Sequence, residues 1–315
     1  MTTNPRKGRR GGGADRSMVP PADFKSYYGR PVVKAAPWKH DIAAYLFTGG
    51  LAAGSALLAA GGDATGRPAL RRAGRLTAIG AVAASTYFLV ADLGRPERFL
   101  NMLRVAKPTS PMSMGTWILS AFGAASGAAA AAELAPSLAW PLLDPLGKVG
   151  QYGAAAVAPA LATYTAVLLA DTATPSWHEA YPELPFVFGG SALASGAAVG
   201  LIAAPTDQAG PARRLAVAGA AMELYATHQV VNSKGLVSEP YRQGRADKLL
   251  RSAAALTAAG AIGSVLGRRS RVVSALSGLS LLAGSLATRF GIFEGGMASA
   301  RDPRYTVIPQ KERAG

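Results

Sequence analysis

Two acid–base side chains lie within residues 215–231, a stretch that is otherwise almost free of charge. They are Glu223 and His228. A carboxylate in apolar surroundings is unfavourable unless it has a partner or a function. We therefore expect Glu223 to act as a proton relay; the alternative is a structural hydrogen bond to a serine or tyrosine of another helix. Five residues correspond to about 140° of helical rotation, so Glu223 and His228 are expected not to share a face.

Four further polar or aromatic residues lie at or near the ends of apolar stretches. His40 and Asp41 follow Trp38, and proton transfer is one reading of this group. The other reading is an interfacial aromatic residue beside a helix-capping aspartate. Tyr164 and Asp171 are seven residues apart, which places them on much the same face of a helix. Tyr164 is either a ligand or a buried hydrogen-bonded tyrosine, and Asp171 either relays protons or ends its helix at the water interface.

Several other kinds of chemistry are excluded by residue type. The chain has no cysteine, which rules out disulfides, thiolate catalysis and any Cys-ligated zinc or iron–sulfur centre within it. No HExxH, P-loop, Ser/His/Asp constellation or GxGxxG followed by a strand is present. His40 and His228 both approach one side and could in principle ligate one haem, but nothing else in the sequence supports a haem.

The elements that must position these residues are apolar segments long enough to cross a bilayer. Only 16% of the residues are charged, against about 25% in ordinary soluble domains, and a span needs about 20 mostly apolar residues. A soluble Ala-rich helical protein is the alternative, but soluble helices have a charged face. We predict eight spans: 42–60, 76–91, 114–132, 149–170, 186–204, 215–231, 252–266 and 272–288.

An internal repeat suggests how the spans are grouped. The run that begins Tyr45-Leu-Phe-Thr-Gly-Gly resembles Phe186-Val-Phe-Gly-Gly-Ser, four spans later. An even number of spans between copies gives parallel repeats. We predict an all-α integral membrane protein with a basic, disordered or interfacial segment (1–40), two four-helix bundles (41–170 and 171–290) and a C-terminal tail (291–315). Small residues such as Gly49, Gly50 and Gly54 would let helices approach closely.

Both termini then lie on one side of the membrane, called the N-side here. Most of the 33 Lys and Arg residues fall on this side. The excess modestly favours cytoplasmic termini in the plasma membrane, although long tails count for less in this rule. Nucleic acid is excluded as a partner, because the basic residues flank apolar spans instead of lining one soluble face.

The loop between the second and third predicted spans, residues 92–117, is strongly basic. It contains Arg95, Arg98, Arg104 and Lys107 and is interrupted by prolines, which prevent one continuous helix. The guanidinium groups of arginines in such a loop suit either anionic lipid headgroups or a partner surface that bears carboxylates.

This loop closely resembles the signature of the NrfD/PsrC family, the membrane subunits of polysulfide-reductase type. The likeness rests on Asp92-Leu-Gly-Arg-Pro-x-Arg-Phe, Asn101-Met-Leu-Arg and Ser110-Pro-Met-Ser-x-Gly-x-Trp117. Weaker likeness covers the Tyr45 run and Tyr164-Thr-Ala-Val-Leu-Leu. The resemblance implies a quinone-reactive subunit that pairs with a ferredoxin-like iron–sulfur subunit, which in turn contacts a molybdopterin-type catalytic subunit.

The same resemblance implies roles for individual residues. The 92–117 loop would be the partner-docking surface, through Asp92, Arg95, Glu97, Arg98, Asn101, Arg104, Ser110 and Trp117. Menaquinone or ubiquinone, bound without a covalent bond, would use a quinone and proton set of Trp38, His40, Asp41, Tyr45, Tyr164, Asp171, Glu223 and His228. The second repeat has Tyr181 and Pro182 where the first has His40 and Asp41, which favours one quinone site, in the first bundle.

The chain itself would hold no haem and no cluster, so the complex's catalytic chemistry would belong to another subunit. The alternative is a proton-conducting or transporter-type subunit without direct quinone chemistry. In that case the repeat, Glu223 and His228 would matter most.

Overall fold

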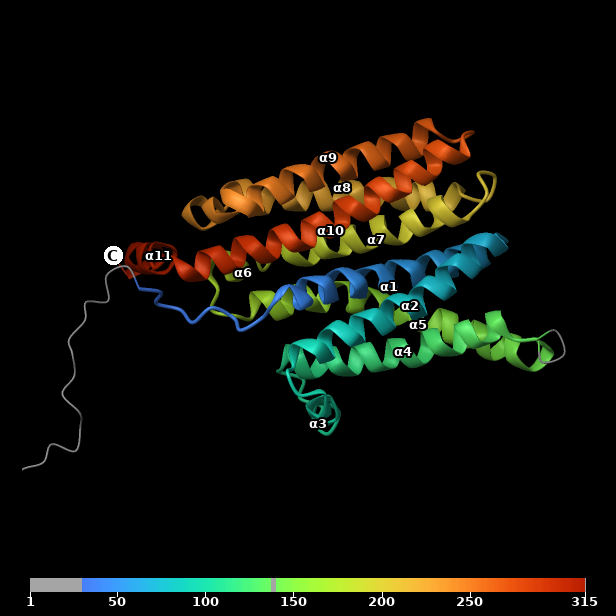
Figure 1. The fold of residues 1–315 in the computed structure, drawn as a ribbon, viewed down its shortest axis with the longest axis horizontal. Helices are drawn as coiled ribbons and strands as arrows, with labels where there is room; N and C mark the ends of the chain where they lie inside the picture. The colour runs from blue at the N-terminus through green and yellow to red at the C-terminus, as the bar shows by residue number, and fades with distance from the viewer. Residues whose placement is uncertain (1–29, 137–139, 315) are drawn as a thin grey trace, which may run out of the picture.

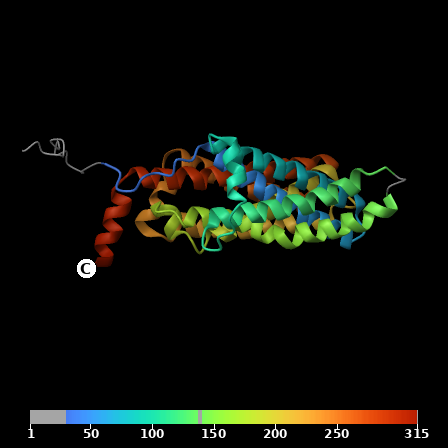
Figure 2. The same ribbon diagram turned by 90° about the horizontal axis from the view of Figure 1, so that it is seen from below.

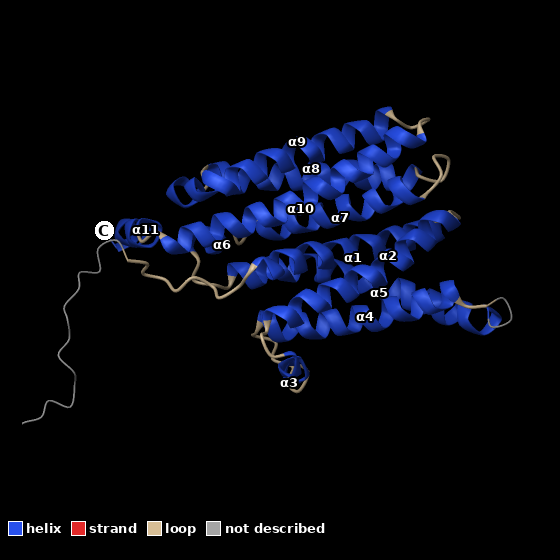
Figure 3. Ribbon diagram, viewed as in Figure 1, coloured by secondary structure: helices blue, strands red, loops and turns tan. Residues whose placement is uncertain are grey.

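Helices make up all the regular secondary structure in the residues that the computed structural model describes, 30–136 and 140–314. The long helices lie side by side along one long axis (Figure 1, Figure 2, Figure 3). The predicted all-α class is confirmed. Most of the predicted N-terminal segment, residues 1–29, lies outside the described residues.

Eight of the described helices have 20 residues or more, and each contains one of the eight predicted apolar stretches or nearly all of it. These helices are α1 (His40–Ala64), α2 (Pro68–Asp92), α4 (Pro111–Leu134), α5 (Trp140–Ala170), α7 (Leu184–Ala203), α8 (Gly210–Asn232), α9 (Gly244–Leu266) and α10 (Arg271–Arg301).

Seven of the eight, all except α8, are long and apolar enough to cross a membrane. The chain is therefore a multi-pass membrane protein. Helix α8 has sufficient length, but it contains Arg213, Arg214 and Glu223, which lower its hydropathy. Among the described helices, seven apolar spans therefore stand where the sequence predicts eight.

Short helices gather at one end of the long ones. They are η1 (Pro96–Arg98), α3 (Phe99–Met102), α6 (Pro175–Glu179), η2 (Gly235–Arg242) and α11 (Arg304–Ala314). Both ends of the described chain lie at this same end (Figure 1), which is the N-side of the sequence analysis. Helix α11 turns sharply away from the direction of the long helices (Figure 2).

Two central helices, α1 and α7, are the most thoroughly buried of the seven apolar ones. Their backbones meet at Gly54 and Gly196, where a β-carbon on Gly54 would lie only 1.9 Å from the carbonyl oxygen of Ala192. Glycine is required there because any side chain would separate the helices. The two segments that resemble each other in sequence are thus in direct contact, and both run away from the N-side (Figure 1).

Several helices extend beyond the predicted spans. Helix α10 does not stop at Thr288 but continues to Arg301, so Arg289 is inside the helix. The sequence prediction ended the span there because arginine normally marks the water interface. That inference was wrong because Arg289 is only 1% exposed and has partners on other helices.

Candidate functional site

A cavity of about 250 Å³ lies at the N-side end of α1, α2, α4 and α5. We call it the first cavity. Its wall combines apolar side chains with a few polar and aromatic ones, among them Trp38, Tyr45, Asp92, Thr116 and Tyr164. Three of these five belong to the predicted quinone and proton set. The first cavity therefore brings together residues that are up to 131 positions apart in the chain, from Pro37 to Leu168.

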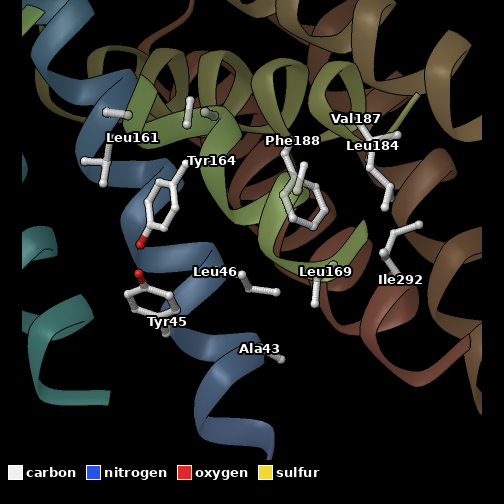
Figure 4. Close-up of a cluster of buried hydrophobic side chains, with 14 of the residues drawn as sticks. Ala43, Tyr45, Leu46, Leu161, Tyr164, Leu169, Leu184, Val187, Phe188 and Ile292 are labelled. Carbon is white, nitrogen blue, oxygen red and sulfur yellow. The ribbon is translucent and has the colours of Figure 1, made fainter. Parts of the chain in front are cut away.

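Two tyrosines face each other at this cavity. The hydroxyl groups of Tyr45, from α1, and Tyr164, from α5, point toward one another (Figure 4). Both side chains are buried, and the Tyr164 hydroxyl has no hydrogen-bond partner in the structure. A buried hydroxyl without a partner is unfavourable, which makes Tyr164 a candidate for binding a hydrogen-bonding group of a ligand.

The position of Tyr164 depends on Gly115 of α4. A β-carbon on Gly115 would lie 2.2 Å from Cε2 of the Tyr164 ring. Gly115 is the glycine of the Ser110-Pro-Met-Ser-x-Gly-x-Trp117 motif. The motif therefore has a local structural purpose, which is to let the tyrosine ring lie directly against the backbone of α4.

Asp92 ends α2 on the wall of the first cavity. Its Oδ1 atom accepts a hydrogen bond of 3.3 Å from the backbone amide of Lys39. Asp41 is close enough to interact with it electrostatically. The sequence analysis places Asp92 on the docking surface, whereas the structure turns it toward the cavity as well, because α2 ends exactly where the loop begins.

His40 lies apart from the first cavity. Its Nε2 atom is 2.8 Å from Oε1 of Glu294 on α10, and its ring packs on Phe290 and Phe293. Arg245 also pairs with this glutamate. His40, the first residue of α1, therefore faces α10 and does not line the first cavity.

A second cavity, of about 470 Å³, lies between α8, α9, α10 and η2. Glu223 and His228 both line it. The two residues nevertheless differ in exposure, since Glu223 is buried and His228 is exposed, as expected for positions about 140° apart on one helix. The cavity is wide enough to contact positions 223, 224, 227, 228 and 231, which together cover a broad sector of α8.

Glu223 is almost completely buried, at 1% exposure. Thr288 of α10 donates a hydrogen bond of 2.6 Å from Oγ1 to Glu223 Oε1, while Oε2 has no partner. The alternative of a structural hydrogen bond is thus realised for one oxygen only, and with a threonine instead of a serine or tyrosine.

The sequence analysis missed Arg289, which is buried one residue after Thr288. Its Nη2 donates to the carbonyl oxygen of Phe188 at 2.7 Å, and its guanidinium lies 3.9 Å from the centre of the Phe188 ring. It is close enough to Glu223 to interact electrostatically. A buried cation near a buried carboxylate lowers the free-energy cost of both charges.

A third polar cluster, which the sequence did not reveal, joins α2, α4 and α5 at the end of the molecule opposite the N-side. Glu133 Oε2 accepts from Arg75 Nη1 at 3.1 Å and from Arg71 Nε at 3.3 Å. Arg75 Nε donates to Gln151 Oε1 at 2.6 Å. The signal was available, because Arg75 and Glu133 each flank an apolar stretch, but the sequence does not show that the two meet.

Asp171 is exposed on the N-side and lines a separate hollow with His178, Val237 and Tyr305. It does not reach the first cavity with Tyr164. A separation of seven positions would place Tyr164 and Asp171 on one face of a helix, but α5 ends at Ala170, so Asp171 already lies beyond its last turn.

The residues assigned to docking divide into two kinds. The side chains of Arg95, Glu97, Arg98, Asn101 and Arg104 are exposed at the N-side. Ser110 instead caps α4 by accepting a hydrogen bond from the amide of Ser113, and Trp117 donates from Nε1 to the carbonyl oxygen of Val105. These last two hold the loop in its conformation.

A family described as polysulphide reductase, NrfD matches residues 32–219, more than half of the chain. The matched region contains the first cavity, the 92–117 loop and α7, and it ends within α8, before Glu223. No curated protein matches the chain.

Proposed function

The chain belongs to the polysulphide reductase NrfD family, and from this membership we propose that it exchanges electrons between an iron–sulfur partner subunit and membrane quinone. The observation behind the proposal is the first cavity, where two buried tyrosines face each other beside Asp92. Family membership supports a membrane subunit of a redox complex, and the cavity supports a specific place for the quinone.

The first cavity suits the head group of a quinone. Its volume of about 250 Å³ is slightly below the range of about 300–1,000 Å³ for drug-sized ligands, so a ring fits while an isoprenoid tail remains outside. A quinone takes up two electrons and two protons when it is reduced. Tyr164 and Tyr45 would bind its oxygen atoms, and Asp92 would hold or release a proton close to water.

The position of the cavity also suits electron transfer from a docked partner. Leu93 and Met102, which belong to the 92–117 loop, form part of its wall. A partner bound to the exposed arginines of that loop would therefore lie next to the quinone. A molybdopterin-type catalytic subunit would contact the iron–sulfur partner and not this chain.

The loop gives a first prediction about assembly. Reversing two exposed charges, with Arg98→Glu and Arg104→Glu together, is expected to weaken binding of the iron–sulfur subunit about tenfold or more, because the partner must be complementary to this basic surface. Co-purification and the dissociation constant measure the effect. Arg268→Glu with Arg269→Glu, at the other end of the molecule, is the matched control, and equal loss in both double variants would contradict docking on the 92–117 loop.

Gly115 provides a second prediction. Gly115→Ala would force the Tyr164 ring away from α4; such overpacking costs about 1–3 kcal/mol, so we expect quinone binding to weaken about tenfold. Gly123→Ala is the control, since a β-carbon there meets no atom within 4 Å. The measurement is the Michaelis constant for quinol, and an unchanged value in Gly115→Ala would count against the site.

The proposal extends to topology. Helix α7 ends away from the N-side and α9 begins at it, so α8 must bring the chain back across the membrane (Figure 1). We therefore propose eight spans. Helix α8 is tolerated because Glu223 is buried between helices and its two arginines, Arg213 and the exposed Arg214, lie near its first turn, at the end away from the N-side. The contact between the two similar segments at Gly54 and Gly196 supports two bundles related as parallel repeats. The plasma membrane, with the N-side in the cytoplasm, is the proposed location.

A second function, proton conduction through the second bundle, is favoured by one observation. Glu223 is buried in a membrane helix with one unpartnered carboxylate oxygen. Glu223→Gln is expected to abolish proton movement coupled to turnover while the subunits stay assembled, because the amide cannot carry a proton in the same way. A pH-sensitive dye in proteoliposomes measures this, with the exposed Asp207→Asn as control. Normal coupling in Glu223→Gln would refute the relay.

A further inference from the structure

Four buried polar atoms without a hydrogen-bond partner lie around the second cavity. They are Glu223 Oε2, Thr227 Oγ1, Tyr241 OH and Thr257 Oγ1. Buried polar groups nearly always have a partner, and each exception needs an explanation. The four residues come from three different elements (α8, η2 and α9) and line one cavity. Their unpartnered atoms are themselves buried, so a single ligand or a group of waters in the cavity would satisfy them once the side chains turn toward it.

The rest of the wall combines apolar and polar side chains. Leu224, Val231, Leu250 and Ala253 supply apolar surface, and polar or charged groups come from His228, Asn232, Arg242, Asp247, Arg251 and Thr288. Its volume of about 470 Å³ lies inside the usual range of ligand pockets, about 300–1,000 Å³. A chamber of this size, lined by both apolar and polar side chains, suits an amphiphilic ligand.

The second cavity also reaches the outer surface of the helix bundle. Ala254 on α9 is exposed at its rim, and it lies about 15 Å along the helix from Gly244. This part of α9 is within one of the seven apolar helices. A ligand could thus move between the lipid and the cavity by passing between α8 and α9.

The polar groups restrict the chemistry of the ligand. Three of the four are hydroxyls and one is a carboxylic oxygen, so they suit a head group with O–H donors and carbonyl-type acceptors. Tyr241, in η2 outside the long helices, remains a donor because burial raises its pKa. Two arginines also line the cavity, but Arg251 pairs with Asp247 and Arg242 is exposed. An anionic phosphate head group is disfavoured among the four buried atoms, because it would meet Glu223 there and no cation is one of the four.

We propose that the second cavity is a second binding site for quinone or quinol, distinct from the first cavity. The choice of a quinone as the ligand rests on the proposed function, whereas the site itself rests on the geometry of the second cavity. Thr288 already occupies Oε1 of Glu223, so Oε2 is free to accept from a quinol hydroxyl. Thr257 and Tyr241 are placed to bind the same ring from α9 and η2. The site lies outside the part of the chain that the family match covers.

The test uses the full chain, purified with its partner subunits in lipid nanodiscs and labelled by light with an azido-naphthoquinone that has a short prenyl tail. Labelled peptides are then mapped by mass spectrometry. We expect labels near Tyr164 and, separately, on residues 224–231 or 247–257. Thr257→Val removes one hydrogen-bonding group and should reduce the second label on the order of fivefold. Ala254→Phe, at an exposed position that the fold tolerates, should block access and reduce it further.

The control variant is Thr86→Val, whose hydroxyl bonds only to its own helix, at the carbonyl oxygen of Val82; it should leave both labels unchanged. Labels near Tyr164 alone, or α8 and α9 labels that persist unchanged in Thr257→Val and Ala254→Phe, would overturn the second site and leave the proposed function intact. Labels on α8 and α9 alone would support the second site while removing the first. The absence of label at both places would overturn the first and the second quinone site.

Discussion

Quinone-linked electron transfer is expected to fall about 100-fold when Tyr164 is replaced by phenylalanine. The Tyr164 hydroxyl is the one group of the first cavity that is buried, unpartnered and aimed at a second phenol. A positioned proton donor or acceptor contributes typically 100- to 10,000-fold to a rate, and a hydroxyl shared with Tyr45 should lie at the low end. Turnover with a soluble quinol analogue, in the assembled complex, measures the loss.

The control for this prediction is Tyr87→Phe. Tyr87 is also on a long helix, but its side chain is 68% exposed on the outer face of α2 and lines no cavity described above. The fold and assembly of both variants should be the same, because phenylalanine keeps the ring that packs against Gly115. Wild-type turnover in both Tyr164→Phe and Tyr45→Phe would remove the first cavity from the chemistry.

The largest effect on stability is expected at Glu133. Arg75 is 2% exposed, and among the described residues its ion pair is with Glu133, while Asp63 acts on it from farther away. Glu133→Ala would leave the buried Arg75 guanidinium without a directly paired carboxylate, which costs about 3–5 kcal/mol. The free energy of unfolding in mixed micelles, measured by titration with denaturing detergent, should decrease by that amount.

A second variant separates pairing from packing. Arg75→Met combined with Glu133→Met removes both charges, so it should be less destabilising than Glu133→Ala alone. Asp144→Ala is the control, because it breaks the Lys148 pair, in which the lysine side chain is 52% exposed; such pairs contribute about 0.2–1 kcal/mol. Equal effects of Glu133→Ala and Asp144→Ala would show that the Arg75 cluster is not a buried ionic network.

The positions of the spans could be predicted from the sequence because apolar length is a local property. A run of about 20 uncharged residues has few alternatives to a membrane helix. The 92–117 motif identified the family for a similar reason, since it is a long and specific local pattern. Its prolines and Ser110 fix where α4 begins, and Gly115 leaves space for an aromatic ring on a neighbouring helix.

The sequence was less informative about helix ends. A charged residue normally marks the water interface, but Arg289 and Arg75 lie inside helices because other helices supply their partners. Pairing across helices removes the cost that would otherwise keep a charge out of the bilayer. The sequence lists the charges but not the pairs, so α10 was predicted to end 13 residues too early.

What the sequence determined by itself was the class of the protein, an all-α membrane chain of the NrfD family, together with Tyr45, Tyr164 and Glu223 as residues of interest. The tertiary structure alone decided which of them meet. It placed Tyr45 with Tyr164 and Asp92, turned His40 toward Glu294, and brought Glu223 and His228 to one cavity. The reason is that these contacts depend on how each helix is rotated and which helix lies beside it. Those quantities are set by the packing of small residues such as Gly54 and Gly196 over the whole bundle, and no local pattern contains them.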